Sequence, residues 1–172
     1  TLAFAAFYII ASQVIYSMTY NRSLKDSERT FIVTSYQEML ESWSANSPNP
    51  ISYEIADAMP EVEAIASMRP HLFPKSVFSK INEYHFEKFP YGITNCNFSI
   101  TDVFNFNIIA GDIVDFNVEN AIMISRSAAE IMNVEVGGQI YTDSNGKPDN
   151  SFNVVAIFED FEENTILSNR HI

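Results

Sequence analysis

The stretch Asn120-Ala-Ile-Met-Ile-Ser-Arg-Ser-Ala-Ala-Glu-Ile-Met132 decides the fold class, because a strand pattern gives way to a helix pattern within it. Residues 120–124 form a short stretch whose last four residues are apolar, as expected of a buried strand. Ser125 then offers a helix N-cap, and Asn133 marks the end of a helix that runs through Met132. A strand joined directly to a helix predicts a domain of the α+β class.

The sequence downstream of this unit predicts a long hairpin. Its arms are residues 139–142 and 151–158, and the polar residues 143–149 form the turn. Gly137-Gly138 stands between the helix and the first arm, which indicates a turn with positive φ. Alternation along the second arm places four apolar side chains on one face, namely Phe152, Val154, Ala156 and Phe158.

Working upstream, the sequence predicts a second hairpin from residues 77–81 and 84–89, which flank Asn82-Glu83. Thr101 could cap a short helix over residues 101–106, and Gly111-Asp112 indicates a turn.

Closer to the N-terminus, residues 30–34 have the composition of a strand and residues 42–50 that of a loop. Asn49-Pro50 predicts the start of a helix, which Pro60 should end near Met59. The apolar face of this helix would comprise Ile51, Ile55, Ala58, Met59 and Val62.

The N-terminal segment differs from the rest, since residues 1–21 carry no charged side chain. A helix over residues 2–18 would be about 25 Å long, slightly short of the hydrocarbon core of a bilayer. We interpret residues 1–20 as the C-terminal part of a first transmembrane helix and residues 21–172 as an extracytoplasmic domain. A buried core helix and a secretory signal are the alternatives. The expected membrane-anchoring residues are Leu2, Phe4, Phe7, Ile10 and Val14.

Composition limits the function. The chain has 172 residues, 47% of them hydrophobic, and a formal net charge of −12. Such a length suffices for a hydrophobic core, and such a charge disfavours binding to nucleic acid. Cys96 is the single cysteine, which excludes an internal disulfide and a thiolate zinc cluster.

No residue pattern predicts catalysis, a cofactor or a metal site. A phosphate-binding loop would need the Gly-x-x-x-x-Gly-Lys spacing, which the sequence lacks. The acidic run at residues 159–163 is typical of a solvated connection, and Cys96 has no neighbouring positive charge to activate it. Asp143, Asn145 and Asp149 have a spacing that resembles a calcium loop, but they are better explained as the tip of a hairpin. The three histidines, His71, His85 and His171, are better explained as structural residues.

Several short motifs, taken in order, resemble a known family. They are Tyr20-Asn-Arg-Ser-Leu-Lys-Asp-Ser-Glu-Arg-Thr-Phe31, Met59-Pro-Glu-Val-Glu-Ala-Ile65, Phe98-Ser-Ile-Thr-Asp-Val-Phe-Asn-Phe106, Ile109-Ala-Gly-Asp112, Ala121-Ile-Met-Ile-Ser-Arg-Ser-Ala-Ala129, Val136-Gly-Gly-Gln-Ile140 and Phe152-Asn-Val-Val-Ala-Ile-Phe-Glu-Asp-Phe161. Over residues 2–167 the chain resembles the MacB-like periplasmic core domain of FtsX-like, MacB-type ABC transporter permeases, in the form common among Bacteroidetes. It departs from the family at Gly138-Gln139, where a Gly-Lys pair is usual, and in stopping at Ile172, short of a further strand.

The resemblance implies an α+β periplasmic domain with porter-like and inserted β-rich parts, carried on the bacterial inner membrane. Its role would be mechanical: it would couple the motion of transmembrane helices, driven by a separate cytoplasmic ABC ATPase, to efflux or to a periplasmic partner. The implied partners are that ATPase, a second permease copy and a periplasmic adaptor or lipoprotein. The domain itself would have no catalytic residue and no cofactor.

The extracytoplasmic ligand-binding domain of a sensor kinase or chemoreceptor is the alternative. It would also show one membrane span followed by an aromatic-rich domain without catalytic residues. The segments that follow in the parent gene would distinguish the two, because a permease continues with three more spans and a sensor with one.

Overall fold

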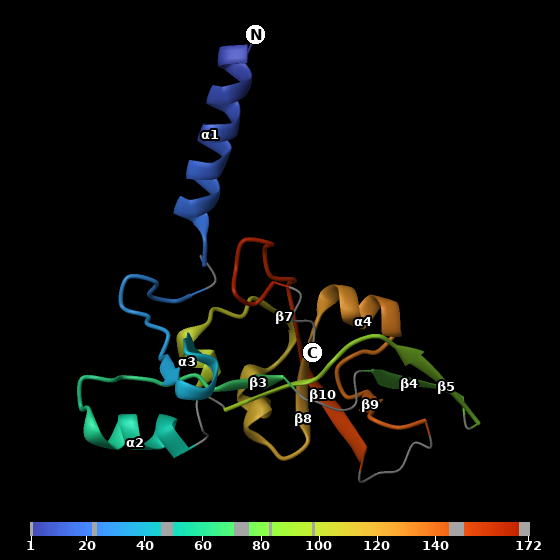
Figure 1. The fold of residues 1–172 in the computed structure, drawn as a ribbon. Coiled ribbons are helices and arrows are strands. Elements are labelled where there is room, and N and C mark those ends of the chain that lie inside the picture. Colours follow the sequence, from blue (N-terminus) through green and yellow to red (C-terminus); the bar gives the residue numbers. More distant parts are fainter. Residues whose placement is uncertain are drawn as a thin grey trace.

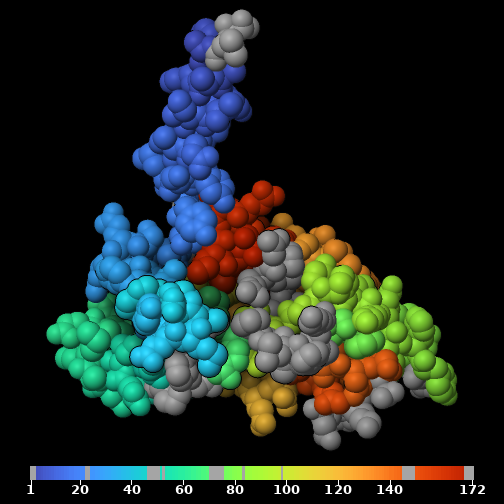
Figure 2. Space-filling view, in the orientation of Figure 1, coloured from blue at the N-terminus to red at the C-terminus, as the bar shows by residue number. Residues whose placement is uncertain are grey.

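The computed structural model describes residues 2–21, 24–45, 50–70, 76–82, 84–97, 99–144 and 150–168. A long helix projects from a mixed α+β body (Figures 1 and 2). The helical elements are α1 (Leu2–Thr19), α2 (Pro50–Ala58), α3 (Ile100–Val103), α4 (Arg126–Met132) and the 3-10 turns η1 (Glu38–Leu40) and η2 (Ile113–Asn117). The predicted α+β class is confirmed for the described residues.

A six-stranded sheet forms the centre of the body, and β10 (Ser151–Phe158) is its hub. β10 pairs antiparallel with β9 (Gln139–Tyr141) and β7 (Ile108–Gly111), and parallel with β8 (Ala121–Ser125). The sheet continues from β9 through β4 (Val77–Asn82) to β5 (His85–Phe89). Two small antiparallel ribbons stand apart from it: β1 (Ser35–Gln37) with β2 (Ser42–Ser44), and β3 (Met68–Pro70) with β6 (Thr94–Cys96).

The stretch from β8 to α4 folds as its sequence predicts. The Ser125 hydroxyl accepts a hydrogen bond from the Ala128 amide at 3.3 Å, and Asn133 ends α4 in the left-handed conformation. α4 packs against the sheet through Ala128 and Met132, which are buried with Ile124 and Ile140 in one core cluster. The hairpin of β9 and β10 and the hairpin of β4 and β5 are confirmed as well.

The expected single apolar face of β10 is wrong, because a bulge interrupts the strand. The register to β8 shifts between Val154 and Ala156, so that Val155 has no partner there. A bulge of one residue reverses the alternation beyond it. Val154 therefore joins the cluster beneath α4, whereas Ala156 and Phe158 join a second cluster, which includes Met123.

The region before α2 also differs from expectation. Residues 31–34 are not in a strand, and the strand lies at β1; its partner β2 falls within the expected loop. The strand-forming side chains at Phe31, Ile32 and Val33 are exposed, and no strand among the described residues pairs with them. The ribbon is held instead by its own turn and by Tyr36 and Trp43, whose ring centroids are 5.7 Å apart.

The other predicted helices are close to the observed ones. α2 begins at Pro50 and ends before Pro60, as expected, while Asn49 lies outside the described residues. α3 is one turn long and begins at Ile100, before the expected cap Thr101. Its formation follows burial, because Ile100 and Phe104 form a small core cluster with Leu167.

Candidate functional site

The N-terminal helix α1 is apolar on all sides and touches little of the body. Of the expected anchoring residues, Phe4 is 81% exposed and Phe7 71%, and Ile10 and Val14 are also exposed. Leu2 lies in the helix, but its side chain is outside the described part. A helix that is apolar all round is ordinarily buried in protein or in lipid. In the described ranges, no helix combines the length and the apolar character needed to cross a membrane.

The end of α1 is fastened to the body by a hydrogen-bonded junction. The Asn164 amide group donates from Nδ2 to the Thr19 carbonyl oxygen at 3.1 Å and to Thr19 Oγ1 at 2.7 Å. In return, the backbone amide of Asn21 donates a hydrogen bond to the backbone carbonyl of Asn164 at 2.9 Å. The side-chain oxygen Oδ1 of Asn21 accepts one from the backbone amide of Ile166 at 2.8 Å. We call these four residues, Thr19, Asn21, Asn164 and Ile166, the clasp.

The conformation of Asn21 explains why the chain turns there. Its φ is +61°, in the left-handed region that asparagine tolerates better than most residues. The helix ends at Thr19, and Asn21 contacts the turn that carries Asn164. Each asparagine satisfies backbone groups on the opposite segment, so the two segments fix each other.

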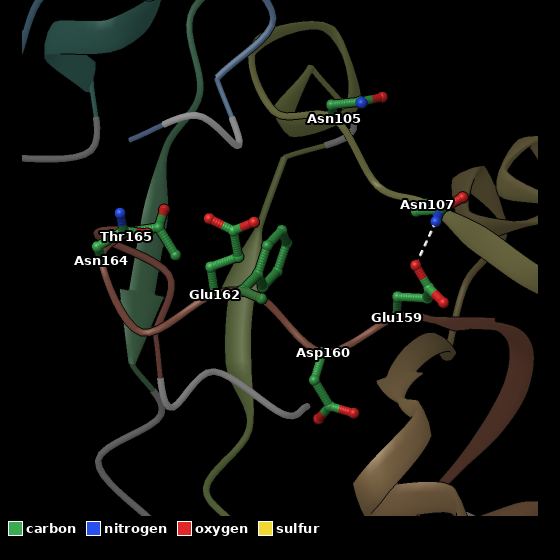
Figure 3. Close-up of a pocket in the computed structure, with 8 residues that line it drawn as sticks. Asn105, Asn107, Glu159, Asp160, Glu162, Asn164 and Thr165 are labelled. Atoms are coloured by element: carbon green, nitrogen blue, oxygen red, sulfur yellow. Dashed lines mark hydrogen bonds between the residues drawn. The ribbon is translucent and has the colours of Figure 1, made fainter. Parts of the chain in front are cut away.

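The segment after β10 leads from the sheet to the clasp, and it is held at its start. Glu159 accepts a hydrogen bond from Asn107 (Figure 3). It accepts another from Arg126 at 2.8 Å. Asp160 points away from Glu159 and accepts hydrogen bonds from Ser127, from both its backbone amide and its hydroxyl. The first two residues of the acidic run thus tie the segment after β10 to α4, whereas Glu162 and Glu163 are exposed, as expected of a solvated connection.

A shallow hollow of about 210 Å³ lies along this segment. Figure 3 shows the side chains around it, including Asn105, Glu162 and Thr165. Its oxygen-rich lining could attract a cation, but no three acidic, histidine or cysteine side chains among the described residues are arranged to hold one.

The other candidate residues do not form a site in the described part of the chain. His85 is exposed on β5, and Asp143 is at the end of the β9 arm; His71, His171, Asn145 and Asp149 lie outside the described residues. Burial raises the pKa of the Cys96 thiol to about 11, which keeps it protonated at neutral pH. A protonated thiol is a poor nucleophile.

Sequence analysis missed the clasp. Asn21 and Asn164 are ordinary turn-forming residues, and 143 positions separate them, so no local pattern connects them. The one sequence feature that the two asparagines share is their setting. Asn21 follows the predicted N-terminal helix and Asn164 follows the predicted strand 151–158, each in a polar stretch.

The fold and the clasp together define an α+β domain joined firmly to an exposed apolar helix. Neither a protein-family model nor a curated protein matches the sequence. The structure is similar to a crystal structure of a domain from Porphyromonas gingivalis that its description assigns to a permease protein, with a TM-score of 0.52 and 19% sequence identity. The match covers 67% of this chain and 52% of that chain. At this identity the likeness establishes a shared fold.

Proposed function

We propose that the chain is the extracytoplasmic domain of an ABC transporter permease of the MacB-like, FtsX-like type, with α1 as the end of its first membrane-spanning helix. The observation that carries the proposal is α1 itself, an apolar helix exposed on all sides yet fastened to a folded body. Water disfavours such a surface by roughly 25 cal/mol per Å², whereas hydrocarbon does not. The shared fold with a domain described as belonging to a permease supports the same assignment.

The role of the domain is mechanical rather than catalytic. Hydrogen bonds at both asparagines of the clasp make the end of α1 and the 164–166 turn move together. From that turn the chain runs back through Asp160 and Glu159 to α4 and β10. Tilting of α1 in the membrane would therefore be passed to the central sheet. ATP hydrolysis takes place in a cytoplasmic ABC ATPase, and the domain faces the periplasm and engages an adaptor or lipoprotein, in a dimer of permease copies.

Vesicle binding tests the membrane assignment. The full chain should bind vesicles of neutral phosphatidylcholine, and Ile10→Lys should weaken binding on the order of a hundredfold, because a lysine in the centre of an inserted helix costs about 3 kcal/mol. Met39→Lys is the matched control, since Met39 is 95% exposed on the body. Failure of the unmodified chain to bind, or equal loss in both variants, contradicts the proposal.

The parent gene tests the permease assignment separately. Three further hydrophobic spans downstream, with an ABC ATPase encoded nearby or fused, are the expected result. One span that leads into a kinase or methyl-accepting segment would contradict it and would make the chain a sensor domain instead.

A further inference from the structure

The β1–β2 ribbon turns its aromatic face away from the body. Tyr36 and Trp43 are directly opposite each other in the register, so their side chains lie on the same face, and both are exposed. The half-buried residues of the two strands are Ser35, Gln37 and Ser44, which alternate with them and lie on the other face. A strand pair usually directs its apolar face to the core and its polar face to water. The ribbon does the reverse.

The turn at the end of the ribbon adds two more exposed apolar side chains. Met39 is 95% exposed and Leu40 64%. We call Tyr36, Met39, Leu40 and Trp43 the ribbon face; the ribbon lies at the front of the body in Figure 2. Aromatic residues and methionine are enriched in protein–protein interfaces, and clustered apolar side chains on a surface indicate a place of contact. The ribbon face therefore has the composition of a binding surface.

Acidic side chains border this face. Glu38 and Glu41 flank the two apolar residues of the turn, and both are exposed. Neither forms a salt bridge among the described residues. The wider stretch from residue 30 to residue 68 contains six carboxylates and no lysine or arginine. A molecule that binds here therefore meets apolar side chains next to negative charge.

This charge argues against two kinds of partner. A second copy of the chain would bring the same acidic surface and a net charge of −12, and like charges across an interface repel each other. A membrane surface fits no better, because anionic headgroups attract basic rather than acidic side chains. A positively charged partner with apolar side chains complements both features of the ribbon face.

We propose that the ribbon face binds a short basic segment of another protein. Apolar side chains of that segment pack against Trp43 and Leu40, and its lysine or arginine side chains lie beside Glu38 and Glu41. A cation can also lie over the face of the Trp43 ring. A surface of so few side chains gives weak and transient binding. The inference stands on the ribbon and its charges alone, and it does not depend on the proposed function.

Tryptophan fluorescence provides a local readout, because Trp43 is the single tryptophan of the chain. The full chain, in neutral detergent micelles, is titrated with the peptide acetyl-Lys-Leu-Lys-Leu-Lys-amide, which should shift the Trp43 emission to the blue in a saturable manner. Two matched peptides carry serine in place of leucine or glutamate in place of lysine. Each should bind at least about ten-fold more weakly, since one loses the apolar contact and the other meets like charge.

Paired variants separate local charge from net charge. Glu38→Gln together with Glu41→Gln should weaken binding of the basic peptide about three- to ten-fold, because two exposed charge pairs are lost. Glu130→Gln together with Glu135→Gln is the matched control, since it removes the same charge at exposed positions in and just after α4. Equal loss in the two double variants would show that net charge alone attracts the peptide, which contradicts the proposal.

A second pair tests the apolar contact. Leu40→Ser should weaken binding about three- to ten-fold, whereas Val118→Ser, at a position with the same 64% exposure, should not change it. No saturable shift of the Trp43 emission with the basic peptide would overturn the proposal. A blue shift caused by anionic vesicles alone would assign the face to a membrane, and one caused by raising the protein concentration alone would assign it to a second copy; either result would overturn it as well.

Discussion

At the scale of single residues, Asp160 shows how a side chain distant in sequence can complete a helix. Ser125 satisfies the Ala128 amide at the start of α4, and Asp160 satisfies the Ser127 amide at 3.1 Å. A carboxylate at a helix N-terminus also interacts favourably with the helix dipole. Two of the open donors in the first turn are therefore satisfied, one by the N-cap residue Ser125 and one by Asp160 from the segment after β10.

Replacing Asp160 tests this cap. Asp160→Ala should lower the free energy of unfolding by about 1 kcal/mol, the usual cost of losing a capping side chain, as measured by urea denaturation. Glu162→Ala is the matched control, because Glu162 is an exposed carboxylate two residues away, and it should change stability by less than about 0.5 kcal/mol. Equal effects would show that Asp160 does not cap α4.

Cys96 gives a prediction for alkaline pH. Burial raises the pKa of its thiol from 9.0 to about 11 in the folded chain. Between pH 9 and 11 the unfolded thiol is therefore ionised while the folded thiol keeps its proton, so the native state binds more protons and loses stability as pH rises. Denaturation at several pH values should show this decline, and Cys96→Ala should make it shallower. An identical pH dependence in the two proteins would contradict the assignment.

At the scale of secondary structure elements, Gly111 and the β10 bulge depend on each other. Gly111 has a φ of +81°, and a Cβ atom placed there would lie 2.1 Å from the Val155 carbonyl oxygen. The bulge turns that carbonyl towards the end of β7, where it accepts a hydrogen bond from the Asp112 amide. Only a residue without a side chain permits this approach.

Gly111→Ala should therefore destabilise the domain by at least about 2 kcal/mol, because it adds both a strained φ and a collision with backbone. Gly92→Ala is the control, since a Cβ at Gly92 meets no atom within 4 Å and its φ is not in the left-handed region. Thermal unfolding of the two variants compares them directly. A stability of Gly111→Ala similar to that of Gly92→Ala would mean that the bulge shifts at little cost.

Helix ends that are determined by neighbouring residues could be predicted from the sequence. The cap Ser125, the stop at Asn133 and the start at Pro50 each act on neighbouring residues, and the structure confirms the helix ends that they indicate. The bulge at Val155 has no such local cause, because it lies in the pairing of β10 with β8, a separate strand. The strand expected at residues 30–34 was wrong for the same reason, since composition favours a strand but cannot supply its partner.

At the scale of the whole molecule, the candidate site was the least predictable part. The apolar helix was visible in the sequence, and the structure confirms a helix there as α1. Its attachment to the body was not visible, because the clasp joins two asparagines that are far apart in the sequence. Pairing of that kind depends on the complete fold, which local patterns do not encode.

The clasp gives a prediction about the orientation of α1. Spin labels at Ala5→Cys and Lys88→Cys, in a Cys96→Ala background, report the distance between α1 and β5. Asn164→Ala should broaden the distance distribution, because it removes both side-chain hydrogen bonds to Thr19. Glu163→Ala, an exposed change in the same turn, should leave the distribution narrow. Equal widths in both variants would show that the clasp does not hold α1.

The position of β10 in the chain bears on the order of events during synthesis. β7, β8 and β9 all precede β10, and each of them pairs with it. The ribosome releases these strands one after another, but they cannot pair with β10 until residue 158 has left the exit tunnel. α1 emerges more than a hundred residues earlier. Its apolar surface must therefore find its environment while the nascent body is still without a core, and contacts of such high sequence separation close slowly.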